Sequence, residues 1–195
     1  DGATQLQNAL PSITSSVEVT LKALQNVADS TSSIVTTIRQ AIADGQLTDE
    51  EKAKIDSLVK AYQASVPQQQ EAIGNLIDFL QKAQESAGNN EFDATIKNLQ
   101  DLSALLGDIS TRLGKVNEFV QAGDISSIEA YLDQIDALAK NISGLVGQIN
   151  VPDITAKVQS VLTQLIATIK NAQGLLTKAQ AIDFESLLSS TSKTV

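Results

Sequence analysis

Aliphatic side chains recur along most of the chain in alternating steps of four and three residues. Because an α-helix completes a turn every 3.6 residues, this spacing places them along one side of a helix. The chain has only three Pro and ten Gly among its 195 residues. The pattern therefore predicts long amphipathic helices with few interruptions. The first stripe consists of Val17, Leu21, Leu24, Ala28, Val35, Ile38 and Ile42, with Thr31 at its one polar position.

The periodic segments predict five helices, over residues of about 13–43, 49–87, 91–121, 126–149 and 153–181. In the second segment the stripe keeps its phase through Pro67, so we expect one helix kinked near that residue rather than two helices. Asn150-Val151-Pro152-Asp153 is a firmer break. The last residues, 189–195, are expected to form a flexible tail.

Helix-end signals accompany these boundaries. Thr48 with Glu51, and Ser126 with Glu129, have the spacing of a capping box, in which each side chain bonds the backbone N–H of the other residue. Asp153 is placed to cap the last helix. The pair Asn89-Asn90 is expected to cap the third. Three glycines are expected to end the first three helices, since glycine can adopt the left-handed conformation past a C-terminus. They are Gly45, Gly88 and Gly123.

Links of about three to six residues make consecutive helices run antiparallel. The expected fold is a single all-α domain over residues 1–195, an elongated antiparallel bundle of about five amphipathic helices with coiled-coil-like packing. At 1.5 Å per residue, its helices would form a rod of roughly 45–55 Å. The main stabilising term would be the burial of the aliphatic stripes against one another, at about 0.8 kcal/mol per methylene.

Composition excludes several classes of function. The chain has no Cys, His or Met, so it cannot form disulfides, use thiolate or imidazole catalysis, or build a zinc site from Cys and His. Its net charge is −9, and nucleic-acid binding would need a basic face. No apolar run approaches the roughly 18 residues of a membrane-spanning helix. We expect no cofactor, no metal site and no enzymatic activity.

One acidic segment resembles part of a calcium site. Residues 44–51 look like the second half of an EF-hand loop, whose first and third ligands would here be Gln40 and Ile42. Calcium requires oxygen ligands at both positions, and the side chain of Ile42 has none. We therefore interpret the segment as a turn between two helices.

Neighbouring carboxylates could in principle form an acid–base pair. The candidates are Asp133 with Asp136, and Asp49 with Glu50 and Glu51. A catalytic pair needs burial or a cleft to separate its two pKa values. These residues lie beside the aliphatic stripes, which favours a solvated helix face.

A few single positions also carry a possible role. Tyr62 interrupts an aliphatic stripe, and we expect it at the edge of the core with its hydroxyl in water, although it could mark a ligand cavity. Residues 141–143, Asn-Ile-Ser, form an N-glycosylation sequon, one of which is expected by chance. The small residues Ala28, Gly107 and Gly114 either let helices approach closely or are tolerated surface positions.

The sequence begins at Asp1 and contains no Met, which suggests a processed chain. With no oxidisable sulfur, we expect a secreted or cell-surface location. In helix number, composition and Asp start, the chain resembles the exchangeable insect apolipophorins, which are Cys-free bundles of five amphipathic helices. It is also similar in broad pattern to the fungal hydrophobic-surface-binding and cell-wall mannoprotein family.

Two functions are expected. The first is a non-catalytic bundle that binds an apolar ligand, lipid or a hydrophobic surface, either by parting its helices or by enclosing an acyl chain. Wide aliphatic stripes with few aromatic residues favour it. The alternative is a structural or assembly module of a surface layer, filament, phage particle or adhesin, acting through self-association or a protein partner. Near-regular heptads favour this alternative. The sequence identifies no catalytic, cofactor-binding, metal-binding or ligand-binding residue.

Overall fold

The computed structural model describes residues 2–164, 167–168 and 170–172, with side chains from residue 14 onward. In this part of the chain every regular element is helical, which confirms the predicted all-α bundle. The elements are α1 (Gly2–Ile42), α2 (Asp49–Ala87), α3 (Asp93–Ala122), the short 3₁₀ turn η1 (Ile125–Ser127), α4 (Ile128–Gln148), and a fifth helix over residues 151–164.

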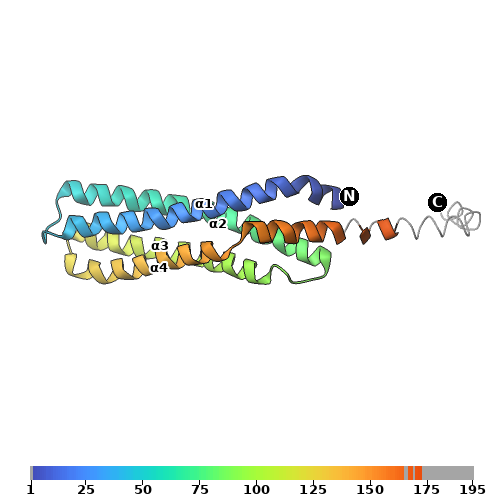
Figure 1. Cartoon of the computed structure of the whole chain (residues 1–195). Coiled ribbons are helices and arrows are strands. Elements are labelled where there is room, and N and C mark those ends of the chain that lie inside the picture. Colours follow the sequence, from blue (N-terminus) through green and yellow to red (C-terminus); the bar gives the residue numbers. More distant parts are fainter. Residues whose placement is uncertain (1, 165–166, 169, 173–195) are drawn as a thin grey trace, which may run out of the picture.

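The helices form an elongated bundle in which α1, α2, α3 and α4 run antiparallel in turn (Figure 1). The fifth helix does not turn back. It continues in the direction of α4 and completes the fourth rod of the bundle (Figure 1). Thr14 and Thr155, whose hydroxyl oxygens are 3.3 Å apart, place it beside the first part of α1. The expectation of antiparallel neighbours was therefore wrong for this last pair, because a break of two residues is too short to reverse the chain.

The bundle is also longer than expected. Helix α1 has 41 residues and begins at Gly2, not near residue 13. At 1.5 Å per residue it extends over about 60 Å. Pro11 lies inside it, as Pro67 lies inside α2. A proline removes one main-chain hydrogen bond, and the turns on either side carry the helix through. The predicted helix end at 181 and the tail 189–195 fall outside the described residues.

The core consists of the predicted aliphatic stripes. In α2 and α3 the buried side chains recur at the four-three spacing of the sequence, and Phe92, just before α3, is completely buried. In α4 the sequence predicts a stripe that includes Leu138 and Leu145, but both side chains are only partly buried, and Ala139 is buried instead of Leu138. Among the described residues, Val19 is the one large hydrophobic side chain that is exposed, at 63%.

Some of the predicted caps are present. Thr48 and Glu51 form the full capping box at the start of α2, with side-chain-to-backbone distances of 3.1 and 2.9 Å. Gly45, Gly88 and Gly123 all have positive φ angles, as expected past a helix end.

Other predicted caps are wrong. Ser126 donates its hydroxyl hydrogen to Asp124, and no side chain caps α4. At the fifth helix, Asn150 Oδ1 accepts from the backbone N–H of Asp153, so Asn150 is the capping residue. At α3 the residue before the helix is Phe92, and no side chain caps it. The spacing permits a cap at Ser126 and at Asp153, but each residue has another partner. Ser126 donates to Asp124, and the N–H of Asp153 donates to Asn150.

Candidate functional site

Two glutamines of α2 cross the interface with α3 and reach its backbone. Gln63 Nε2 and Gln70 Nε2 each donate to a serine carbonyl of α3 at 3.1 Å. Both amides lie over a glycine. A Cβ at Gly114 would lie 2.8 Å from Gln63 Nε2, and a Cβ at Gly107 would lie 3.4 Å from Gln70 Nε2. These two glycines therefore make room for side chains that link the helices, which the sequence had left open.

The same interface has polar contacts nearer the first turn of α2. Asn117 Nδ2 donates to Asp56 Oδ1 at 2.8 Å, and Gln121 Nε2 donates to a carbonyl of α2 at 2.9 Å. The hydrogen bond from Asn117, followed by that from Lys60, lowers the pKa of Asp56. The carboxylate is thus held ionised as an acceptor between the two helices.

The far end of α2 is tied to the start of α3. The side-chain amide of Gln84 accepts from the backbone N–H of Phe92 at 3.0 Å and donates to Asp93 Oδ1 at 2.8 Å. Since the ring of Phe92 is fully buried, the loop over residues 88–92 is anchored on both sides. Helices α2 and α3 are therefore joined by hydrogen bonds along their whole contact.

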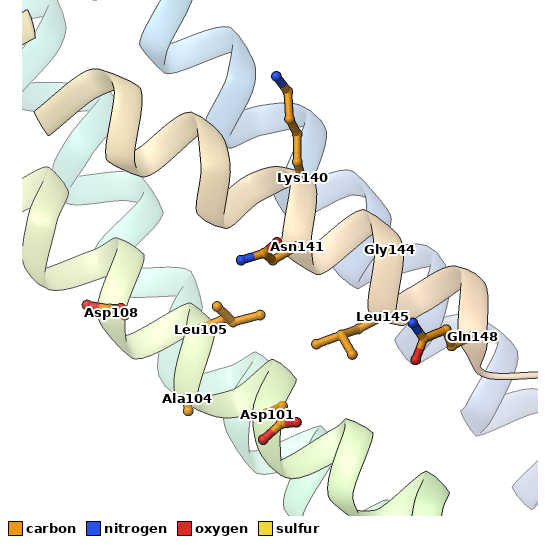
Figure 2. A pocket seen from close by; sticks show the side chains of 9 residues that line it. All are labelled: Asp101, Ala104, Leu105, Asp108, Lys140, Asn141, Gly144, Leu145 and Gln148. Carbon is orange, nitrogen blue, oxygen red and sulfur yellow. The ribbon is translucent and has the colours of Figure 1, made fainter. Parts of the chain in front are cut away.

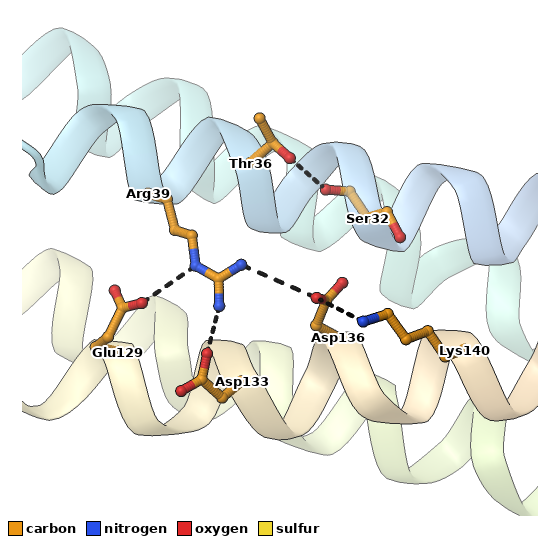
Figure 3. Close-up of polar contacts among 7 residues, drawn as sticks. All are labelled: Ser32, Thr36, Arg39, Glu129, Asp133, Asp136 and Lys140. Carbon is orange, nitrogen blue, oxygen red and sulfur yellow. Dashed lines mark hydrogen bonds and ion pairs between the residues drawn. The ribbon is translucent and has the colours of Figure 1, made fainter.

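Helices α1 and α4 are joined by charges. Arg39 lies opposite three carboxylates of α4, at 3.2 Å from Glu129, 2.5 Å from Asp133 and 4.0 Å from Asp136 (Figure 3). Lys140 approaches Asp136 from the other side, at 3.9 Å (Figure 3). The carboxylates considered above as an acid–base pair are thus brought together around a shared cation, as a surface ion-pair network. Local sequence patterns do not indicate this network, because Arg39 and its partners on α4 are 90 or more residues apart.

Tyr62 is placed differently from the expectation. It is only 5% exposed, and its hydroxyl lies 2.9 Å from the hydroxyl of Thr31, the polar residue in the first stripe. Thr31 also donates to the carbonyl of Val27 at 2.7 Å. Burial raises the pKa of Tyr62 to about 12, partly offset by the bond to Thr31. The expectation of a hydroxyl in water was wrong: the two polar interruptions of the stripes satisfy each other inside the core.

A groove of about 500 Å³ lies between α3 and α4. Leu105 and Leu145 point toward each other across it, and Asn141 also points into it (Figure 2). Gly144 lies beside them, and a Cβ there would have no heavy atom within 4 Å. Lys140 lines the rim but extends away from the gap (Figure 2). The result is an open groove with two leucines at its floor and the amides of Asn141 and Gln148 in its lining.

The charged members of this rim are already compensated. Asp101 pairs with Lys97 at 3.4 Å, and Asp108 pairs with Arg112 at 3.1 Å. The groove therefore presents the aliphatic side chains of Leu105 and Leu145 and the neutral amides of Asn141 and Gln148 to a ligand. Sequence reasoning noted Asn141 only as part of a sequon. Ser143 of that triplet accepts a hydrogen bond from Gln25 on α1 at 3.2 Å, while the side chain of Asn141 is exposed.

The segment that resembles half of an EF-hand is a turn with local hydrogen bonds. Asp44 Oδ1 accepts from the backbone N–H of Gln46 at 3.0 Å, and Glu51 belongs to the capping box. Gln40 is exposed on the last turn of α1, and Ile42 is packed against the core. Within the described ranges, no three acidic side chains are grouped closely enough to hold a metal ion.

None of the described helices combines the length and the hydropathy that crossing a bilayer requires. No protein-family model, curated protein or solved structure matches the chain.

Proposed function

We propose that this protein is a non-catalytic carrier or binder of amphiphiles with an acyl chain. The observation that supports this most is the groove between α3 and α4, with Leu105 and Leu145 at its floor. Its volume of about 500 Å³ falls in the range of small-molecule sites, which are mostly apolar with a few placed polar groups.

We expect ligands with a neutral head group to bind more tightly than ligands with a charged one. Asn141 offers an amide donor and acceptor to the groove, which suits an ester, an alcohol or a protonated acid. The acidic side chains of the rim are paired with cations, but the whole chain carries a net charge of −9. This field opposes the approach of an anion. A monoacylglycerol is therefore expected to bind more tightly than a fatty-acid anion.

The assembly alternative has less support. A heptad stripe drives association between chains when it is unpaired. Here the aliphatic stripes are used within one molecule, and Val19 alone among the described large hydrophobic residues is exposed. Association through the described part of the chain would have to use polar surfaces.

The test is a titration with monooleoylglycerol, followed by displacement of a fluorescent acyl analogue. Gly144→Leu should fill the groove and weaken binding by tenfold or more. Gly74→Leu is the matched control on α2, because its Cβ also meets no heavy atom within 4 Å. It should leave binding unchanged, and circular dichroism should give the same helical content for both variants.

Two results would count against this proposal. One is the absence of saturable binding by the unaltered chain. The other is equal binding by the Gly144→Leu and Gly74→Leu variants, which would remove the α3–α4 groove as the site.

A further inference from the structure

A second groove lies along the α3–α4 interface, next to the one with Leu105 and Leu145. Its volume is about 470 Å³. The charged and aromatic side chains in its lining include Arg112, Lys115 and Glu118 of α3 and Tyr131 of α4. Asp108 borders both grooves, about one helical turn beyond Leu105 (Figure 2). The two grooves therefore meet at Asp108.

The second groove differs chemically from the first. The first has leucines at its floor and uncharged amides in its lining, whereas the second has two cations and an aromatic ring. The whole chain has only two arginines and two tyrosines, and one of each borders the second groove. A few polar groups that converge on a concave place are typical of sites that orient a ligand.

Arg112 has one nitrogen available to a ligand. Its Nε donates to Asp108 at 3.1 Å, and its Nη1 donates to Gln134. A guanidinium has five N–H donors, and in the described part of the chain Nη2 donates to no group. Lys115 Nζ, the neighbouring cation, lies 3.3 Å from Glu118 Oε2. A phosphate can therefore accept from both cations while the ion pairs of the rim stay in place.

The aromatic rings beside these cations suit a quaternary ammonium group. Phe119 and Tyr131 have ring centroids 5.5 Å apart, and both side chains are partly buried. Lys115 Nζ is 5.5 Å from the centroid of Phe119, so this pair of rings already faces one cation. A trimethylammonium group is attracted to an aromatic face in the same way. The carboxylate of Glu118, in the lining beside Tyr131, attracts the same positive charge.

From these observations we infer that the second groove binds a phosphocholine group. The phosphate accepts from Arg112 Nη2 and from Lys115, and the trimethylammonium group contacts the ring of Tyr131 beside Glu118. With its acyl chain in the first groove, the ligand is a single-chain phosphocholine amphiphile, such as a lysophosphatidylcholine. This inference rests on the proposed function, to which it adds the chemistry of the head group.

The charge of the protein is compatible with this ligand. A phosphocholine group has one negative and one positive charge, so it is neutral overall. The net charge of −9 therefore does not oppose its approach as it opposes that of an anion. Compared with a monoacylglycerol, it adds charge-assisted bonds at the second groove.

The order of these groups along the two helices matches the order of the parts of such a ligand. From Leu105 to Arg112, α3 advances by seven residues, or about 10 Å. On α4, Leu145, Asn141 and Gln134 follow in the same direction, since the two helices are antiparallel (Figure 1). Asn141 thus lies between the leucine floor and Arg112, where its amide can bond the ester or the hydroxyl of the glycerol.

Calorimetric titration with two amphiphiles that share an oleoyl chain tests the inference. The unaltered chain should bind oleoyl lysophosphatidylcholine about tenfold more tightly than monooleoylglycerol, because of the added charge-assisted bonds. Arg112→Gln should abolish this difference and leave the affinity for monooleoylglycerol unchanged. Arg39→Gln is the matched control, because Arg39 also pairs with carboxylates on a helix surface but lines neither groove. It should leave both affinities unchanged.

Two results would overturn the inference and leave the proposed function intact. One is that the unaltered chain binds the lysophosphatidylcholine no more tightly than monooleoylglycerol. The other is that the Arg112→Gln variant keeps the preference of the unaltered chain, since its guanidinium would then not contact the phosphate.

Glycerophosphocholine, which has the head group but no acyl chain, tests the second groove by itself. At millimolar concentrations it should shift the NMR signals of the Tyr131 ring saturably, and Arg112→Gln should abolish these shifts. No shift in the unaltered chain would overturn the inference. If the shifts appear and neither amphiphile binds, the proposed function fails while the phosphocholine site stands. Equal affinities for glycerophosphocholine and lysophosphatidylcholine would identify a soluble ester as the ligand and overturn the assignment of a lysolipid.

Discussion

At the scale of single residues, this bundle places a few polar groups where the heptads would otherwise call for aliphatic side chains. Thr31 and Tyr62 are the clearest case, because each occupies a stripe position and each is buried. A buried hydroxyl without a partner would be costly, whereas a bonded pair is close to neutral. Such a pair also favours one alignment of α1 against α2, since sliding either helix would break it.

Replacing Tyr62 by Phe should therefore lower the free energy of unfolding by about 1 kcal/mol, the usual net worth of one hydrogen bond. Thr31 keeps its bond to the Val27 carbonyl in this variant, so its hydroxyl is not left without an acceptor. Urea unfolding at pH 7 is the measurement, with Tyr131→Phe as the control because Tyr131 is only partly buried. Equal losses in the two variants would contradict a specific role for the buried pair.

The same tyrosine should make stability depend on pH at alkaline values. In the folded chain the pKa of Tyr62 is raised from 10.0 to about 12 by burial. Between these values the unfolded chain loses the phenol proton while the folded chain keeps it, so stability falls as the pH rises. Below pH 10 the protonated Tyr62 makes its full contribution to the free energy of unfolding. The Tyr62→Phe variant should show a smaller fall from pH 9.5 to 12 than the unaltered chain, and parallel curves would contradict the assignment.

The helical glycines make a third prediction at this scale. Gly74→Ala should stabilise the chain by about 1 kcal/mol, because alanine favours helix and its Cβ meets no atom within 4 Å. Gly114→Ala should gain much less, since its Cβ would displace the Gln63 amide from its carbonyl. Urea unfolding of both variants measures the difference. Equal gains would mean that the glutamine bridge contributes nothing.

At the scale of elements, helix ends were predicted best where the signal is entirely local. Thr48 and Glu51 lie three residues apart and need no other part of the chain, and the capping box between them forms. Ser126 and Glu129 have the same spacing, yet Glu129 pairs with Arg39 and Ser126 with Asp124. Hydrogen bonds from Ser127 and then Ser126 lower the pKa of Asp124, which marks it as the preferred acceptor of this turn.

Thr48→Ala should consequently destabilise the protein by about 1 kcal/mol, as is usual for the loss of a helix N-cap. Ser126→Ala is the control, because it removes a bond inside an exposed turn and no cap. Thermal unfolding followed by circular dichroism compares the two variants. A loss at Ser126 as large as that at Thr48 would contradict the assignment of the caps.

At the scale of the whole molecule, the sequence predicts most of the core and does not predict the grooves. A stripe such as Leu102, Leu106, Ile109 and Leu113 determines by itself which side of a helix is buried. The direction of the fifth helix depends instead on how few residues separate Gln148 from residue 151. The groove at Leu105 and Leu145 forms because these two residues, at the margins of the aliphatic stripes of α3 and α4, face each other in the folded chain. The local sequence around either residue does not predict this pairing.

Native mass spectrometry of the full chain with monooleoylglycerol tests the central claim most directly, namely that one molecule buries its own stripes and receives an acyl chain between its helices. The expected spectrum at low micromolar concentration contains single chains, a fraction of them carrying one amphiphile. Dimers or larger assemblies that persist on dilution and carry no amphiphile would contradict the account.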